Sequence, residues 1–259
     1  MSQLLRAEGL TFGYDAGVVL HGVAVELNGG EVVALLGPIG SGKSTLIKLL
    51  IGYLRGEGTV DWEGREIGIW KRRELARRVA YLPQTPAWEG GQTVAEALRL
   101  GRAPYWGAFG VESVRDAEVV GGVNQTLGLG ELMNRRMEEI SGGQRQRVFI
   151  GRCLIQEPAA MLLDEPNTFL DLRHQVELGE LLRRLAKERG IGVLMASHDL
   201  NLAGAFADRM VLLCGGKVVK SGAVGEVLDA EVLSRVYGVR MERVERAGGS
   251  PVVIPVVPD

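Results

Sequence analysis

The sequence predicts an α/β fold with a mostly parallel sheet, an antiparallel β-subdomain and an inserted α-helical subdomain. Short apolar runs of strand length alternate with helical patterns along most of the 259 residues. A glycine-rich segment, GPIGSGKST at 37–45, lies between one such strand and one such helix. Residues 93–137 interrupt this alternation with helical patterns only. The predicted fold class rests on these three observations.

The first elements belong to the β-subdomain and to the start of the core. Residues 4–27 alternate in the manner of strands, with Gly and Asn at the breaks, and are expected to pair with residues 58–62. The run Glu31–Leu36 has strand length, and Thr45–Tyr53 follows the glycine-rich segment at helical spacing. The core is therefore expected to begin as strand, loop and helix.

Three further apolar runs predict strands of the same sheet, at 79–82, 160–164 and 191–197. Between the last two, leucines follow the i, i+3, i+4, i+7 spacing of an amphipathic helix, and Gly190 ends the pattern. The leucines are Leu178, Leu181, Leu182 and Leu185. This segment is expected to be a crossover helix between parallel strands.

The helical insertion is expected to cover about residues 93–158 of a single domain that spans 1–259. A basic run at 71–78 precedes it, and a solvated helix face is favoured over a contact with lipid headgroups. From about residue 222 onward the chain repeats no motif, so the sequence predicts no role for this tail.

The composition is that of one globular unit, with 46% hydrophobic and 24% charged residues. No apolar run approaches the roughly 20 residues of a membrane helix, and the polar start lacks the regions of a signal peptide. A cytoplasmic location is expected, with any membrane role supplied by a partner. The formal net charge of −2 argues against broad nucleic-acid binding. Cys153 and Cys214 lie in apolar contexts and are expected to be buried, reduced thiols.

Segment 37–45 has the form G-x-x-x-x-G-K-[ST] of a phosphate-binding loop. Gly37, Gly40 and Gly42 let the backbone aim N–H groups at phosphate oxygens, and the following helix adds the positive end of its dipole. Lys43 is expected to reach the β- and γ-phosphates, and the Ser44 hydroxyl is expected to bind Mg²⁺. The loop therefore predicts that the chain binds a nucleoside triphosphate.

Asp164 and Glu165 follow the apolar run 160–163 in AMLLDEP. A ligand crevice forms at the carboxyl ends of parallel strands, so Asp164 is placed to hold Mg²⁺ through its water shell. Glu165 is expected to polarise the attacking water, because a general base should lie near the γ-phosphate without being a direct metal ligand. An acidic pair that caps the next element is the alternative.

A second helix start lies in ISGGQ at 140–144, where Ser141 as N-cap and Gln144 form the pattern of a capping box. Gly142 and Gly143 are poor helix formers, which indicates close approach of a backbone. Because the loop at 37–45 already encloses a triphosphate, this second anion-binding helix start would face the γ-phosphate from another subunit. An ordinary capped helix is the alternative that the spacing leaves open.

Together these motifs resemble those of the ATP-binding cassette (ABC) ATPases, from about residue 4 to 245. GPIGSGKST matches the Walker A loop, AMLLDEP the Walker B strand, and ISGGQ the family signature, with Ile140 where Leu is commoner. The D-loop matches at 170–171, although 167–169 departs from the commoner Ser-Ala pattern and leaves contacts between subunits there less certain. Single residues match as well: Gln84 the Q-loop glutamine, Tyr14 the aromatic that stacks on adenine, and His198 the switch histidine.

The resemblance implies ATP and Mg²⁺ as cofactors, and a homodimer in which two copies pair head-to-tail around two ATP molecules. ATP closes the pair, and hydrolysis opens it. The implied catalytic residues are Glu165, His198 and Gln84, and the implied Mg²⁺ ligands are Ser44, Gln84 and Asp164. The implied contacts to ATP are Tyr14, Gly37, Pro38, Gly40, Ser41, Gly42, Lys43, Ser44 and Thr45 of one subunit, with Ser141, Gly142, Gly143 and Gln144 of the other.

Residues 93–110, TVAEALRLGRAPYWGAFG, are similar to the stretch after the Q-loop in ATPases of importers for iron–siderophore complexes, haem and cobalamin. The resemblance implies a groove that receives a coupling helix of transmembrane permease subunits, with Arg102 and Tyr105 on its surface. It also implies an indirect partner, a substrate-binding protein, and a peripheral location on the cytoplasmic face of the membrane. Core packing of Tyr105, Trp106 and Phe109 is the alternative.

Other functions stay open at this point. The ATPase of a different importer, or of an exporter, is the main alternative, although a chain without a transmembrane segment suits importers better. A nucleic-acid-associated ABC ATPase would need a long coiled-coil insertion or a second cassette, and the sequence contains neither.

Overall fold

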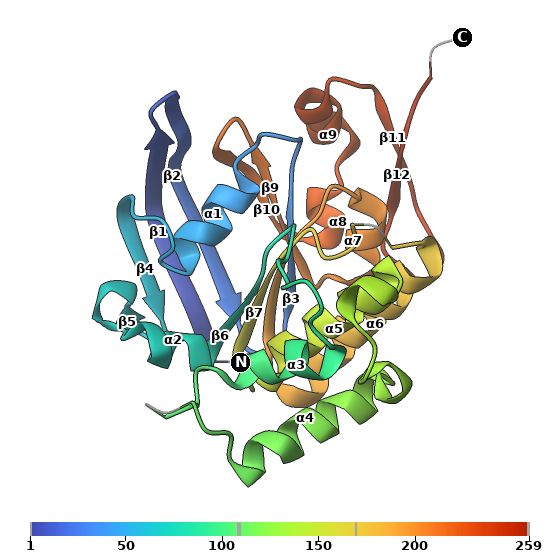
Figure 1. The fold of residues 1–259 in the computed structure, drawn as a ribbon. Coiled ribbons are helices and arrows are strands. Elements are labelled where there is room, and N and C mark those ends of the chain that lie inside the picture. The colour runs from blue at the N-terminus through green and yellow to red at the C-terminus, as the bar shows by residue number, and fades with distance from the viewer. Residues whose placement is uncertain (1, 108–109, 169, 258–259) are drawn as a thin grey trace.

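The computed structural model describes residues 2–107, 110–168 and 170–257. Within these ranges the centre of the molecule is a six-stranded sheet in the order β10-β9-β3-β8-β7-β6 (Figure 1). Strands β9, β3, β8, β7 and β6 are parallel, and β10 is antiparallel to β9. The bounds are β3 Val32–Leu36, β6 Val79–Leu82, β7 Ala160–Asp164, β8 Gly192–Ala196, β9 Arg209–Cys214 and β10 Lys217–Ala223. The predicted α/β class, with a mostly parallel sheet, is confirmed.

A second, antiparallel sheet in the order β2-β1-β4-β5 lies at the left of Figure 1. Its strands are β1 Gln3–Tyr14, β2 Gly17–Asn28, β4 Glu57–Trp62 and β5 Arg65–Glu66. The predicted pairing of segment 4–27 with 58–62 is therefore confirmed. Trp62 ties this sheet to the core, because its side chain is buried and its indole Nε1 donates to the carbonyl of Leu50 at 2.8 Å.

Strand β3 shows how the two faces of the central sheet are covered. Val32, Ala34 and Leu36 point into a core shared with the helices that follow residue 93, whereas Val33 and Leu35 point into a core shared with the antiparallel sheet. Successive side chains of a strand lie on opposite faces, so a strand covered on both sides is apolar throughout. The run that predicted this strand has that composition.

Nine α-helices occur in the described ranges. They are α1 Lys43–Leu50, α2 Arg72–Arg78, α3 Val94–Arg99, α4 Val114–Leu127, α5 Gly142–Ile155, α6 Leu172–Arg189, α7 Leu200–Phe206, α8 Val224–Val227 and α9 Ala230–Tyr237. Helix α6 is the predicted crossover helix, and it ends at Gly190 in the left-handed conformation. Helix α1 begins two residues earlier than predicted and ends at Leu50, shortly before Gly52 at φ +68°.

Helices α3, α4 and α5 lie together at the lower right of Figure 1 and cover one face of the sheet. Gly151 lets α5 approach its neighbours, because a Cβ there would lie 2.9 Å from a methyl group of Leu98 and 3.0 Å from one of Leu127. In α2 the basic run is exposed, and Arg78 pairs with Glu63, which is compatible with the favoured solvated helix face and with the lipid-facing alternative.

The tail after residue 222 is structured, although its sequence predicted no role. It forms α8, α9 and a hairpin of β11 Met241–Val244 and β12 Val252–Pro255, which lies beside α7 (Figure 1). Both cysteines are free; Cys153 is buried as expected, whereas Cys214 is only partly buried. In the described part of the chain, no helix has the length and apolar character that crossing a membrane requires.

Candidate functional site

The loop at 37–45 connects β3 to α1, and two of its glycines are required by their surroundings. Gly37 has φ +148°, and a Cβ on it would lie 2.0 Å from the carbonyl oxygen of Leu213 on β9. Gly42 is the N-cap of α1 with φ +102°, and a Cβ there would lie 2.7 Å from a methyl group of Leu20 on β2. A side chain at position 37 would displace the backbone of β9, and one at position 42 would displace the Leu20 side chain and strain the backbone. The loop is thus held in shape from both sheets.

Lys43 is the first residue of α1 and folds its side chain back over the loop. Its Nζ donates to the carbonyl oxygens of Gly37 at 2.8 Å and Pro38 at 3.2 Å. Burial lowers the pKa of Lys43, while the carboxylates of Glu165 and Asp164 act in the opposite direction. An ammonium held by neutral carbonyls can exchange them for charged phosphate oxygens, which form stronger hydrogen bonds.

The first turn of α1 is open to an anion. Gly42 supplies no side-chain acceptor for the N–H groups of this turn, and the helix dipole adds positive potential there. A Cβ on Gly40 would meet nothing within 4 Å, so the adjoining part of the loop also has space. Ser41 Oγ is buried and has no hydrogen-bond partner within the described ranges.

Asp164 ends β7 and is 3% exposed. Its Oδ1 has no hydrogen-bond partner among the residues that the structure describes. Burial raises the pKa of Asp164, while the Ser44 hydroxyl, Lys48 and Lys43 act in the opposite direction. A buried, unpaired carboxylate oxygen beside a hydroxyl fits the oxygen ligands that Mg²⁺ prefers.

A metal at Asp164 would need oxygen ligands from elsewhere. Within residues 2–107, 110–168 and 170–257, no group of three or more His, Cys, Asp or Glu could hold a metal ion. Mg²⁺ is commonly bound by one or two protein ligands plus water and substrate phosphates. The donor set at Ser44 and Asp164 therefore fits an ion that arrives with a nucleotide.

Glu165 brings together the three residues expected to be catalytic. Its Oε2 accepts a hydrogen bond from Gln84 Nε2 at 2.7 Å, and the same oxygen lies 3.7 Å from His198 Nδ1. These side chains follow the ends of β6, β7 and β8, three adjacent parallel strands whose carboxyl ends meet at one edge of the sheet.

The backbone at Glu165 is strained, with φ +51° in a residue that is not glycine. Strain of this kind costs about 1–3 kcal/mol and clusters at functional sites. A pocket of about 240 Å³ adjoins Glu165 and His198, with Thr168 and Leu202 in its wall. A water molecule therefore has room beside the Glu165 carboxylate.

Tyr14 is the last residue of β1, and 48% of its surface is exposed. Its ring meets Phe12 edge-to-face at a centroid distance of 4.9 Å. It pairs with Gly17, two residues before Val19, whose side chain lies near Gly42 of the phosphate loop. An exposed aromatic ring can stack on a planar base.

The capping box predicted for ISGGQ is present at the start of α5. Ser141 N donates to Gln144 Oε1 at 2.9 Å, and Gln144 N donates to Ser141 Oγ at 3.2 Å. A Cβ on Gly143 would lie 3.5 Å from Leu170 and 3.6 Å from the His174 ring, which is ordinary contact. The expected tight backbone approach is therefore absent at Gly143 in this single subunit.

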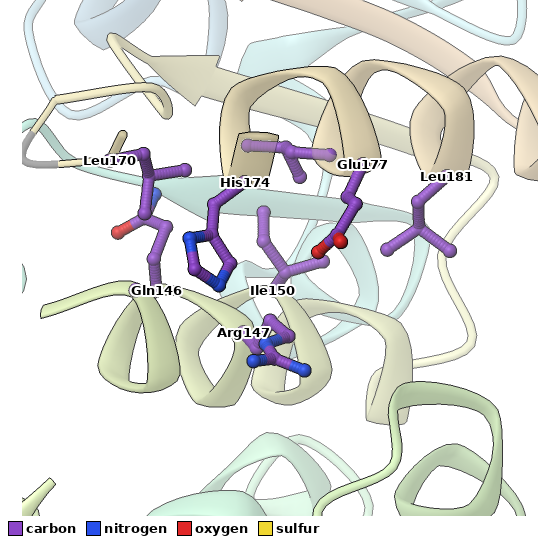
Figure 2. Close-up of a pocket in the computed structure, with 9 residues that line it drawn as sticks. Gln146, Arg147, Ile150, Leu170, His174, Glu177 and Leu181 are labelled. Atoms are coloured by element: carbon purple, nitrogen blue, oxygen red, sulfur yellow. The ribbon is translucent and has the colours of Figure 1, made fainter. Parts of the chain in front are cut away.

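Figure 2 shows the space behind this helix start, where Arg147 and other residues of α5 face Leu170 and His174 across a pocket. The volume is about 50 Å³, far below the several hundred Å³ of a typical ligand site. His174 Nδ1 lies 2.7 Å from Oδ1 of Asp171, the N-cap of α6. The space is therefore part of the packing between α5 and α6.

The structure corrects the expectation for Arg102. It is 2% exposed, and its guanidinium donates to Asp116 at 2.6 Å and to Glu157 and the carbonyl of Ile155 at 2.9 Å. The guanidinium also lies 3.7 Å from the ring centroid of Tyr105. Arg102 is therefore a core residue that joins α4 to the end of α5, and it offers no surface for a partner.

Tyr105 is half-buried, and its hydroxyl donates to the carbonyl of Gln156 at 2.8 Å, which favours the packing alternative for this residue. Phe109 lies outside the described residues. Trp106 has a different position, in the wall of a surface groove of about 460 Å³.

The groove carries a charge pattern that sequence reasoning missed. Glu89, Glu96 and Glu112 line it together with Arg99, which lies 3.7 Å from Glu112. Acidic residues are spread over 24 positions of sequence, from 89 to 112, and nothing in their spacing shows that they share one surface. Only the fold brings them together.

A phosphate loop between β3 and α1, with carboxylates at the end of β7, defines a P-loop nucleoside triphosphatase. The family described as "ABC transporter" matches residues 20–168 of this chain. The ferric enterobactin transport ATP-binding protein FepC of Escherichia coli (strain K12) is 39% identical over 97% of this chain and 94% of that relative. The hemin import ATP-binding protein HmuV of Thermobifida fusca (strain YX) is 38% identical over 98% of this chain and 89% of that relative.

A solved structure agrees with these relatives. It is described as an inward-facing conformation of a putative metal-chelate type ABC transporter, and it matches with a TM-score of 0.87 and 28% identity over 99% of this chain and 98% of that one. The chain therefore belongs to the ABC transporter family and is a transport ATPase, as its motifs predicted.

Proposed function

We propose that this chain is the ATP-binding and ATP-hydrolysing subunit of a membrane importer for iron–siderophore or haem-type complexes. The proposed ATP hydrolysis is supported by one observation: Gln84 and His198 both lie next to Glu165 Oε2. The similarity to the ferric enterobactin and hemin transport ATP-binding proteins supports the transported class. The segment LGRAPY at 100–105 supports the same branch.

Each part of the site has a role in this proposal. The loop backbone and Lys43 bind the phosphates, and Tyr14 stacks on adenine. Ser44 and Asp164 would hold Mg²⁺, which would supply charge neutralisation at the β- and γ-phosphates. Glu165 takes the proton of the attacking water, while Gln84 and His198 orient its carboxylate and, in the complete site, contact the metal and the γ-phosphate respectively.

A second copy of the chain completes the site in this proposal. The α5 start carries Ser141 and, like other helix starts, backbone N–H groups that have no partner within the helix. Head-to-tail pairing would bring the α5 start of one copy to the nucleotide of the other. Charge stabilisation of the transferred phosphoryl group would then depend on both subunits.

The groove beside Trp106 is the proposed contact with the permease, at the cytoplasmic face of the membrane. Its wall carries three carboxylates against one guanidinium. Complementary charge favours a permease segment with Lys or Arg at its centre. Co-purification of the chain with a many-helix membrane protein tests this partner, whereas stimulation of its ATPase by DNA or ribosomes would contradict it.

Replacement of the proposed base tests the hydrolytic mechanism. Glu165→Gln keeps the shape and the hydrogen bond to Gln84 but removes the proton acceptor, so turnover should fall about 10²- to 10⁴-fold while ATP still binds. The matched control is Glu188→Gln, an exposed carboxylate at the end of α6, which should change neither quantity. Turnover of Glu165→Gln within a few-fold of the wild type would show that the base lies elsewhere.

A further inference from the structure

The proposed base lies in a strained turn, residues 165–168, which we call the Glu165 turn. Glu165 has φ +51° and is followed by Pro166, although a residue before a proline prefers extended backbone. A conformation of this kind persists only where the surrounding structure holds it in place. The contacts that hold the Glu165 turn therefore determine where the carboxylate lies.

Two sets of hydrogen bonds hold the peptide groups of Glu165 itself. Its backbone N–H donates to the carbonyl of Ala196 on β8 at 3.2 Å. Its carbonyl accepts from Thr168 N at 3.2 Å and from Thr168 Oγ1 at 3.0 Å. The first bond fixes the turn to the sheet, and the other two close the turn locally.

A further contact reaches the turn from α5. Pro166 is buried and has no N–H, so its carbonyl is the one backbone group that needs a partner. That carbonyl accepts from the side-chain amide of Gln146 at 2.6 Å. Figure 2 shows the Gln146 side chain directed from α5 toward Leu170, which follows the turn. The bond joins residues 20 positions apart and ties the turn to a helix outside the sheet.

The two ends of this bond belong to different nucleotide sites in the proposed function. Glu165 acts on the nucleotide bound by the phosphate loop of its own copy, whereas the α5 start faces the nucleotide of the second copy. Gln146 follows Gln144 of the capping box by two residues, so it belongs to that helix start. A movement of α5 against the second nucleotide would therefore reach the Pro166 peptide of the same copy.

We propose that Gln146 is a positioning residue for ATP hydrolysis, which holds the Glu165 turn on α5 through the Pro166 carbonyl. The inference rests on the proposed function of Glu165 and of the α5 start. Gln146 acts through the peptide next to the base rather than on the nucleotide. Contact of the α5 start with one nucleotide thereby affects hydrolysis of the other.

Replacement of the amide tests this role in the full chain. Gln146→Leu keeps a side chain of similar size but removes the donor, so the Pro166 carbonyl loses its partner. The Kd for ATP should stay within about 2-fold, because the phosphate loop is intact, while kcat should fall about 3- to 10-fold, the effect of one neutral hydrogen bond. A wild-type kcat in Gln146→Leu would overturn the proposal.

The chain offers a matched control at the other end of the same helix. Gln156 is the C-cap of α5, and its side-chain amide donates to the carbonyl of Ala76 at 2.6 Å. Gln156→Leu removes the same kind of bond at the same distance, so it should lower the melting temperature to a similar extent as Gln146→Leu. Its kcat should stay within about 2-fold of the wild type. Equal losses of kcat in both variants would reduce Gln146 to a residue that only stabilises α5.

A double-mutant cycle tests whether Gln146 acts through the base. In a chain that already carries Glu165→Gln, adding Gln146→Leu should lower the residual turnover by less than about 2-fold, since no carboxylate remains to be positioned. Single-turnover hydrolysis of radiolabelled ATP measures such slow rates. A further loss as large as that in the wild-type background would show that Gln146 acts on another part of the site, contrary to the proposal.

Hydrogen exchange in the nucleotide-free chain tests the contact without any turnover. Gln146→Leu should raise exchange in residues 165–168, and Gln156→Leu should not. Unchanged exchange in Gln146→Leu would mean that the bond does not hold the turn, and the proposal would fail. Failure of the proposed function is a different result, because the wild-type chain itself would then not hydrolyse ATP, whatever the exchange in the turn.

Discussion

The starts of α1 and α5 are both candidates for binding phosphate, and they differ in how their backbone donors are occupied. The α1 start has Gly42 as its N-cap, in the left-handed conformation and with no side-chain acceptor. The α5 start has Ser141, whose hydroxyl accepts from Gln144 N in a complete capping box. The α1 start is open to an anion, whereas at the α5 start the backbone N–H of Gln144 is already paired with the hydroxyl of Ser141.

This difference shows which site is formed in a single chain and which needs a partner. At α1 the binding groups are preorganised by contacts with two sheets, so an anion replaces only the carbonyls that hold Lys43. At α5 an anion must compete with the capping box, or the Ser141 hydroxyl must turn to donate to it. The α5 start therefore suits a weaker contact that forms when a nucleotide is already bound opposite.

Mixing two inactive variants is the strongest test of that division of roles. Lys43→Ala disables the loop of α1, and Ser141→Arg disables the start of α5, so neither variant alone should hydrolyse ATP. A dimer of one variant with the other contains one complete site of two, so the mixture should hydrolyse ATP at less than half the wild-type rate. A mixture at the wild-type rate, or an active Ser141→Arg alone, would contradict sites shared between subunits.

Helix α5 lies beside a buried ion pair, that of Arg102 with Asp116, and this pair provides the next test. Helix α5 is joined to α4 through Arg102, and Arg102→Leu leaves Asp116 buried without its partner, which should cost about 3–5 kcal/mol of stability. Arg115→Leu is the matched control. Arg115 pairs with Glu157 at the exposed edge of the same network, so its loss should cost under about 1 kcal/mol. Urea unfolding measures both values, and equal costs would show that burial of Arg102 is unimportant.

The correction at Arg102 shows where sequence reasoning fails in this molecule. The core strands and the phosphate loop could be predicted because their signals are local: an apolar run, or a fixed spacing of Gly, Lys and Ser. The burial of Arg102 depends on Asp116, 14 residues later, and on Glu157, 55 residues later. No local pattern distinguishes such an arginine from an exposed one.

The same limit applies to the rest of the site. Gln84, Glu165 and His198 could be assigned by resemblance to a family, but the hydrogen bond between Gln84 and Glu165 joins residues 81 positions apart. The acidic groove beside Trp106 likewise depends on strand order and helix packing. So do the two hydrogen bonds between the side-chain amide of Asn201 and the backbone of Val253. A tail without any motif therefore still packs against α7, the helix that follows His198.

The smallest expected effect concerns the hydroxyl of Ser141, and it separates a phosphate-binding helix start from an ordinary capped one. Thr93 caps α3 with the same kind of box, so Ser141→Ala and Thr93→Ala should each cost about 1 kcal/mol of stability. If the Ser141 hydroxyl also donates to a phosphate across the dimer, Ser141→Ala alone should slow ATP hydrolysis about 10- to 100-fold, the effect of one hydrogen bond to a charged group. ATP binding to the single chain should be unchanged in both variants, since the α1 loop is intact. Equal hydrolysis rates in the two variants would leave α5 as a capped helix only, and the γ-phosphate would then need a different donor.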